Sequence, residues 1–323
     1  MTQTFWSYLG DEGTAKDFDA EVKRRKSKIV MAPSTLIEVV RLSNPEVRQK
    51  IIQTLTSGPR HRLTTEVHLE CLEVVSEAKR VRPKWLHQVY NAGRISSLNT
   101  YWTKTIWSEA VNDSQRLYTY ETSRLPERDL LTSRQRETRK QILQDKFDIR
   151  PLTALTADLS ADTIPAEFME GWPGHPVEAW RVMSWTLYWN QLVRVPVRAI
   201  ITKEDRTVAD WAGAYLKLES IRSEKADFLR FWATDVELSN MPRNWLRWAV
   251  NVMQMNSKVT PGNPADEQHS AYLVDCDVYL SADANYVKIL NEVRTDAPFS
   301  FAEPCLVSGD KDTPVVDRII AAL

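Results

Sequence analysis

The chain has 323 residues, enough for one large domain or two moderate ones, and a formal net charge of −1 from 42 basic and 43 acidic side chains. That balance excludes a bulk electrostatic attraction to nucleic acid, although it allows a local basic patch. The three cysteines, Cys71, Cys276 and Cys305, form no CxxC pair, so we expect neither a disulfide framework nor a zinc ribbon. The sequence opens without a signal-peptide pattern and contains no apolar run near the ~18 residues of a membrane span. These features predict a cytoplasmic protein with no membrane segment.

The first ninety residues are predicted to be mainly helical, with one strand. Residues 28–32 form a short apolar run typical of a buried strand, and the Pro33-Ser34-Thr35 sequence that follows begins a helix. Proline and apolar spacing also predict two later helices. The helices are expected at residues 18–28, 35–42, 45–55 and 65–79.

Glu38 lies in the second of these helices, between Leu36-Ile37 and Val39-Val40. A carboxylate on a helix that is apolar nearly all round must be paired, hydrogen-bonded or metal-bound. An ion pair with Arg41 or Arg62 would satisfy Glu38, and so would a metal ion. The sequence leaves these alternatives open.

A basic cluster formed by Lys79, Arg80, Arg82 and Lys84 ends the fourth helix, and Trp85 follows it. Such a run most often forms a solvated face. Beside an aromatic side chain it can also contact a phosphate backbone.

The middle of the chain, from about residue 91 to 240, is predicted to be a large helical insertion. Residues 151–170 are expected to be a surface connection, and a helix is expected to begin near Pro176 and to carry Trp185 and Trp189 on one face. An aromatic stripe at this spacing is more often core than binding platform. Further helices are expected at residues 126–147, 207–221 and 223–236, and after Pro242.

The C-terminal segment combines a helix and a strand with two aspartates. Asp266 follows a Pro-Gly-Asn-Pro turn signal and opens a helix, and Asp283 follows the apolar run Val278-Tyr279-Leu280 at the end of a predicted strand. In an α/β sheet, ligands and metals are held where the strands end. A second strand is expected at residues 306–308 and a helix at 315–323. Because Mg²⁺ prefers oxygen ligands, Glu38, Asp266 and Asp283 form a candidate site for metal-dependent phosphodiester hydrolysis.

Two of these segments resemble motifs of the PIN-domain nucleases. The C-terminal acidic motif of the family resembles Asp266, His269 and the sequence DVYLSAD from Asp277 to Asp283, and its second motif resembles IVMAPSTLIEVVR at residues 29–41. The sequence FWSYL at residues 5–9 is similar to the helix after the family's first strand. The resemblance covers roughly residues 2–85 and 240–323, so the chain divides into residues 1–90, a helical insertion at 91–240, and residues 241–323.

The resemblance implies a Rossmann-like three-layer α/β fold with a mainly parallel sheet, and endonuclease action on RNA. It assigns Glu38, Asp266 and Asp283 as the acids that bind Mg²⁺ or Mn²⁺, with a metal-bound water as the nucleophile, and it makes Asp277 structural or a support for the ligands. His269, one turn after Asp266, is expected either to hydrogen-bond phosphate or an acid or to lie on the surface. Toxin nucleases of this kind are controlled by an inhibitory protein partner, and a homodimer is a further expectation.

The sequence departs from the family pattern at its N-terminal end. The family's first strand ends in an aspartate just before the aromatic helix, whereas this sequence has Thr2, Gln3 and Thr4 there, and Ser281 replaces the usual threonine. Either the chain begins downstream of its true start, or the site has lost one acid. In the second case we expect a catalytically degenerate PIN-like scaffold, with the tryptophan-rich insertion as a protein-interaction surface.

Overall fold

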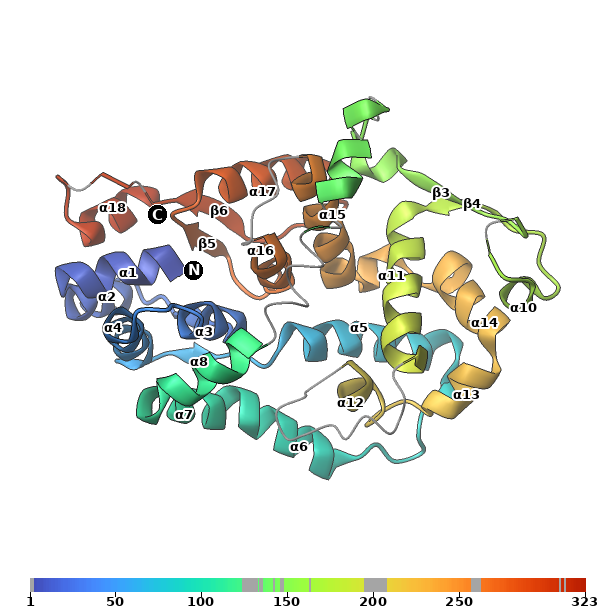
Figure 1. The fold of residues 1–323 in the computed structure, drawn as a ribbon, viewed down its shortest axis with the longest axis horizontal. Coiled ribbons are helices and arrows are strands. Elements are labelled where there is room, and N and C mark those ends of the chain that lie inside the picture. The colour runs from blue at the N-terminus through green and yellow to red at the C-terminus, as the bar shows by residue number, and fades with distance from the viewer. Residues whose placement is uncertain are drawn as a thin grey trace.

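The computed structural model describes residues 3–123, 133, 136–141, 143–145, 148–162, 164–194, 208–256, 263–307, 309–310 and 312–323. These residues form a mixed fold of helices and small sheets in which helix predominates (Figure 1). The coarse α/β class expected from the sequence is therefore confirmed. The single continuous parallel sheet is not seen, because the strands of the described residues form three separate two-stranded sheets.

Among the described residues up to Ser123, α1 to α4, α7 and α8 contribute to one hydrophobic core, whereas α5 and α6 contribute to a second. α3 has Pro at its first position, α4 is capped by Asn44, and α5 is capped by Thr65, whose hydroxyl accepts the amide hydrogen of His68. The helices are α1 (Gln3–Glu12), α2 (Ala15–Arg24), α3 (Pro33–Val40), α4 (Pro45–Thr56), α5 (Glu66–Val81), α6 (Ala92–Thr100), α7 (Ile106–Asn112) and α8 (Ser114–Ser123).

The remaining helices are shorter in the middle of the chain and longer towards its C-terminus. Three π-helical segments, Tyr101–Thr105, Asn190–Arg194 and Phe231–Asp235, each continue directly from an α-helix. The helices are α10 (Ala166–Met169), α11 (Ala179–Trp189), α12 (Val208–Ala212), α13 (Leu218–Ser223), α14 (Lys225–Arg230), α15 (Pro242–Asn256), α16 (Asn263–Ser270), α17 (Ala284–Asp296) and α18 (Val315–Ala322).

Two of the three sheets are parallel pairs. β1 (Val30–Met31) pairs with β2 (His61–Arg62), and β5 (Val278–Ser281) pairs with β6 (Glu303–Leu306). The third sheet is antiparallel and joins β3 (Thr156–Leu159) to β4 (His175–Glu178).

The two parallel pairs face each other across a cavity. Val30 of β1 and both Val278 and Tyr279 of β5 line it, and each of these strands is paired on one edge only within the described residues. α1 begins beside β5, so the start of the described chain lies between β5 and α3 (Figure 1). Within the described residues no ladder of hydrogen bonds joins β1 to β5, so the two parallel pairs do not form one continuous sheet.

Two hydrophobic cores hold the fold together. One combines Trp6 of α1 and Ile52 of α4 with Leu280 of β5 and Ile319 of α18, so the two ends of the chain lie side by side (Figure 1). Residues 106–117, within the expected insertion, also pack into this core. The second core is built mainly from residues between Ile149 and Ala302, and Cys71, Val74, Ala78, Trp85 and Leu98 also belong to it. The three-segment division of the chain stays a prediction.

Several local expectations need correction. Residues 151–170 are not a plain connection, because they contain β3 and α10. Pro176 lies in β4 and the helix begins only at Ala179. The expected helix at 207–221 is broken between α12 and α13, and the last strand lies at 303–306 rather than 306–308. The expected helix at 126–147 lies mostly outside the described residues.

Within the described residues no helix is long and apolar enough to cross a membrane.

Candidate metal and active site

Glu38 lies on α3 at the edge of the first core. Leu36 and Val39 are fully buried on either side of it, while the Glu38 side chain keeps 19% of its surface exposed. The apolar helix thus anchors the backbone and leaves the carboxylate at the margin of the core. This is the placement that the sequence predicted.

His269 of α16 holds Glu38 in position. Its Nε2 lies 2.8 Å from Glu38 Oε2, and its Nδ1 lies 2.9 Å from the Ser34 hydroxyl. The imidazole is 2% exposed, so it is not a surface histidine. Neither Arg41 nor Arg62 forms the ion pair with Glu38 that the sequence allowed, and Arg41 instead bonds Glu121.

The environment of Glu38 favours its ionised form. Burial raises the pKa of the Glu38 carboxyl group. The charge of His269 and its hydrogen bond lower that pKa by more than burial raises it, so the net pKa lies below its usual range. Glu38 is therefore a carboxylate at neutral pH. Only its Oε2 has a hydrogen-bond partner within the described part of the chain.

Asp266 lies in the first turn of α16, as predicted, and is fixed from two sides. Its Oδ2 accepts a hydrogen bond of 3.1 Å from Gln254 Nε2 of α15, and its backbone carbonyl accepts one of 2.8 Å from the Tyr286 hydroxyl of α17. Burial, followed by the charges of Glu38 and Asp283, raises the pKa of Asp266 well above its usual range. The charges of both other acids therefore act on Asp266, and no cationic side chain of the described residues bonds its carboxylate.

Asp283 follows β5 and caps α17. Its Oδ1 accepts the amide hydrogen of Tyr286 at 3.0 Å, and its own amide hydrogen bonds the hydroxyl of the buried Ser281. The acid is exposed, at the C-terminal end of a parallel strand. Serine in place of threonine therefore still supplies the hydroxyl that fixes this turn.

The three predicted acids come from three separate elements, and the charges of Glu38 and Asp283 both act on Asp266. In each acid, one carboxylate oxygen accepts a hydrogen bond from a positioning group, and the other has no protein partner in the described ranges. Oxygen donors held in this way suit a hard divalent cation. Among the described residues, there is no group of three histidine, cysteine, aspartate or glutamate side chains placed to coordinate one metal ion. The donor set fits Mg²⁺ or Mn²⁺ in chemistry, with few direct protein ligands.

Sequence reasoning missed the residues that support these acids. Gln254, Tyr279 and Tyr286 are buried to 5% exposure or less, and their positions on α15, β5 and α17 fit ordinary core residues. The one sequence feature that could have linked any of them to the acids is the four-residue spacing between Tyr279 and Asp283, which is a weak signal. Asp277, expected to be structural or to support the ligands, is exposed.

Two other candidate features have structural roles. The basic cluster is neutralised by acids of residues 224–237, where Arg82 bonds Asp227 and Asp235 and Lys84 bonds Glu224. Trp185 packs against Phe168 in the core, as predicted. Most tryptophans of the expected insertion are buried, including Trp107, Trp180, Trp211 and Trp232.

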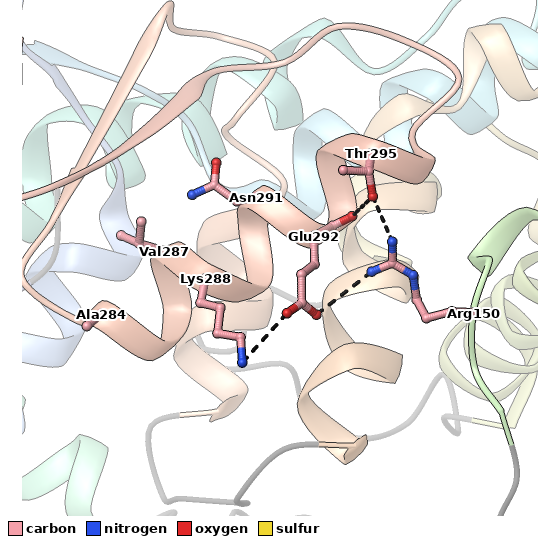
Figure 2. A pocket seen from close by; sticks show the side chains of 7 residues that line it. All are labelled: Arg150, Ala284, Val287, Lys288, Asn291, Glu292 and Thr295. Carbon is pink, nitrogen blue, oxygen red and sulfur yellow. Dashed lines mark hydrogen bonds and ion pairs between the residues drawn. The ribbon is translucent and has the colours of Figure 1, made fainter.

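A shallow groove of about 550 Å³ runs along α17, beginning at Ala284 next to Asp283 (Figure 2). Arg150 lines it and bonds Thr295 at 2.7 Å, and its charge is matched by nearby acids. Lys288 is 74% exposed and lies 3.8 Å from Glu292, which leaves its charge available to solvent.

Comparison of the chain with protein-family models, with curated proteins and with solved structures finds no match in any of the three.

Proposed function

We propose that the chain is a PIN-type nuclease that hydrolyses phosphodiester bonds in RNA, with Glu38, Asp266 and Asp283 holding Mg²⁺ or Mn²⁺. The observation that carries the proposal is that the charges of Glu38 on α3 and Asp283 at the β5–α17 junction both act on Asp266 of α16, which bonds no cationic side chain among the described residues. The charges of Glu38 and Asp283 disfavour the ionised form of Asp266, and a bound divalent cation would relieve that repulsion.

The chain's own residues orient the acids. His269 and Ser34 fix Glu38, while Gln254 and Tyr286 fix Asp266. A divalent cation, when bound, supplies positive charge for the phosphate and lowers the pKa of a coordinated water. The groove along α17 gives an RNA strand a path next to Asp283, with Lys288 placed to contact a phosphate.

A second function remains in contention, that of a degenerate PIN-like scaffold. It is favoured by the lack, among the described residues, of a ready group of three metal ligands. The buried tryptophans give little support to an interaction surface built from them. An inhibitory partner and a homodimer stay predictions that follow from the resemblance.

Cleavage of end-labelled single-stranded RNA by the full chain, with Mn²⁺ or with EDTA, tests the proposal. We expect Mn²⁺-dependent cleavage that falls at least about a hundredfold in Asp266→Asn, because that variant removes a metal-binding charge. Asp277→Asn is the matched control, since Asp277 belongs to the same sequence motif but is exposed. Activity that survives Asp266→Asn, or no cleavage with any metal, would overturn the nuclease proposal in favour of the scaffold.

A further inference from the structure

Two buried polar atoms beside Asp266 have no hydrogen-bond partner in the described part of the chain. They are the hydroxyl of Tyr279 and the amide oxygen of Gln254, on side chains that are 5% and 1% exposed. A buried polar atom without a partner destabilises a fold by about 1–3 kcal/mol. Most such atoms in native proteins are paired, so these two call for a partner that the protein itself does not supply.

Gln254 bonds one of the acids directly, and Tyr279 lines a cavity together with His269, which bonds Glu38. Gln254 uses its Nε2 to hold Asp266, which places its amide group beside that carboxylate. Burial raises the pKa of the Tyr279 phenol, and the negative charges of Asp266, Glu38 and Asp283 raise it further. The Tyr279 ring packs edge-on against Tyr286, with centroids 5.9 Å apart.

The chemistry of the two atoms is complementary. Tyr279 offers a hydroxyl that can donate or accept, whereas Gln254 Oε1 can only accept. A water molecule can donate to an amide oxygen and either donate to or accept from a hydroxyl, and a water on a cation is an especially strong donor. Mg²⁺ dehydrates reluctantly and usually keeps several waters. Such an ion needs fewer direct ligands than a fully coordinated one, in keeping with the lack of a ready trio of side chains.

We propose that Tyr279 and Gln254 bind a water of hydration of a divalent cation in the acidic cluster, so that the ion is held partly through its water shell. This inference deepens the nuclease proposal and rests on its metal site. Tyr279 is here a positioning residue, since it contacts the ion's water rather than the ion.

Binding of Mn²⁺ to the full chain, measured by electron paramagnetic resonance without RNA, tests the inference. We expect Tyr279→Phe to weaken Mn²⁺ binding about tenfold, as the loss of one hydrogen bond to an ion's water should. The metal-free variant should melt at the same temperature as wild type or higher, because its unpaired hydroxyl is gone. Tyr286→Phe is the matched control: it removes a hydroxyl that is already bonded, to the Asp266 carbonyl. It should therefore lower the melting temperature.

Hexaamminecobalt(III), which cannot exchange its ligands, provides a second measurement that needs no variant. If the ion is held through its water shell, this complex should displace Mn²⁺ from the wild-type chain. Unchanged Mn²⁺ affinity in Tyr279→Phe, or failure of the cobalt complex to compete, would overturn the inference. Normal Mn²⁺ binding without RNA cleavage would overturn the nuclease proposal alone, and a wild-type chain that binds no Mn²⁺ would overturn both.

Discussion

Asp266→Asn is expected to stabilise the metal-free protein while it removes the proposed metal site. The Asp266 side chain is half-buried, the charges of Glu38 and Asp283 act on it, and its one side-chain hydrogen bond within the described residues comes from Gln254. An asparagine oxygen can keep that bond. The backbone bond from Tyr286 to residue 266 does not involve the side chain at all.

The size of the effect follows from the charges involved. At an effective dielectric constant of about 20, repulsion between two neighbouring like charges is on the order of 2 kcal/mol, and the charges of Glu38 and Asp283 both act on Asp266. His269 offsets most of the repulsion from Glu38, because it pairs with that acid directly. We therefore expect Asp266→Asn to raise the free energy of unfolding by about 2 kcal/mol. For a chain of 323 residues that corresponds to a melting temperature roughly 3 °C higher.

Thermal unfolding at pH 8, with EDTA and then with Mn²⁺, measures this effect. Wild type should gain stability from Mn²⁺, because an ion that binds only the folded state stabilises it. Asp266→Asn should have a higher melting temperature than wild type in EDTA, and Mn²⁺ should raise that temperature little. A variant less stable than wild type in EDTA would refute the reasoning, because it would mean that the carboxylate makes a net favourable contact in the metal-free fold.

Three further predictions concern the acids and the sheets. Asp283→Ala should lower the free energy of unfolding by about 1 kcal/mol through loss of the α17 cap, whereas Asp283→Asn should keep the cap, and both should lose Mn²⁺-dependent cleavage; urea melts and the RNA assay separate the two roles. Burial, opposed by Arg247, raises the pKa of Glu70 to about 7, so its contribution to stability is fully present below about pH 4.5 and is lost as the pH rises through about 7. In denaturant melts between pH 4.5 and 8, the free energy of unfolding of Glu70→Gln should fall less with rising pH than that of wild type, by up to about 3 kcal/mol. An equal fall in the two proteins would contradict this prediction. Within the described residues, β1 and β5 each have one edge that pairs with no other strand. A five-residue strand-forming segment fused ahead of Gln3 could pair with such an edge, so it should raise the melting temperature above that of a control fusion of equal length that contains proline.

Local pattern was sufficient to place the three acids on their elements. Proline at the start of α3 and the turn before α16 define helix starts, and the apolar run before Asp283 defines a strand end. These signals act within a few residues, so they can be read from the chain directly. The grouping of the acids needs contacts across more than 200 residues, such as the one between Glu38 and His269.

Other features were missed for the same reason. Glu66, Glu70 and Glu77 recur at helical spacing on α5 and would ordinarily mark a solvated face, yet all three are buried. Their partners lie far along the chain: Arg247 bonds Glu70, and the Tyr272 hydroxyl bonds Glu66. A buried acidic face can be recognised only when the opposing helix is in place. The β3–β4 pair was missed because apolar and polar residues alternate only weakly along these two strands. The pair is defined by its cross-strand register, which the sequence alone does not reveal.

Anomalous diffraction from crystals of the full chain grown with Mn²⁺ tests the central claim most directly. The account predicts a manganese peak bounded by the carboxylates of Glu38, Asp266 and Asp283, with His269 still bonded to Glu38. A well-ordered structure with no peak among these acids, or with manganese bound only elsewhere, would contradict it.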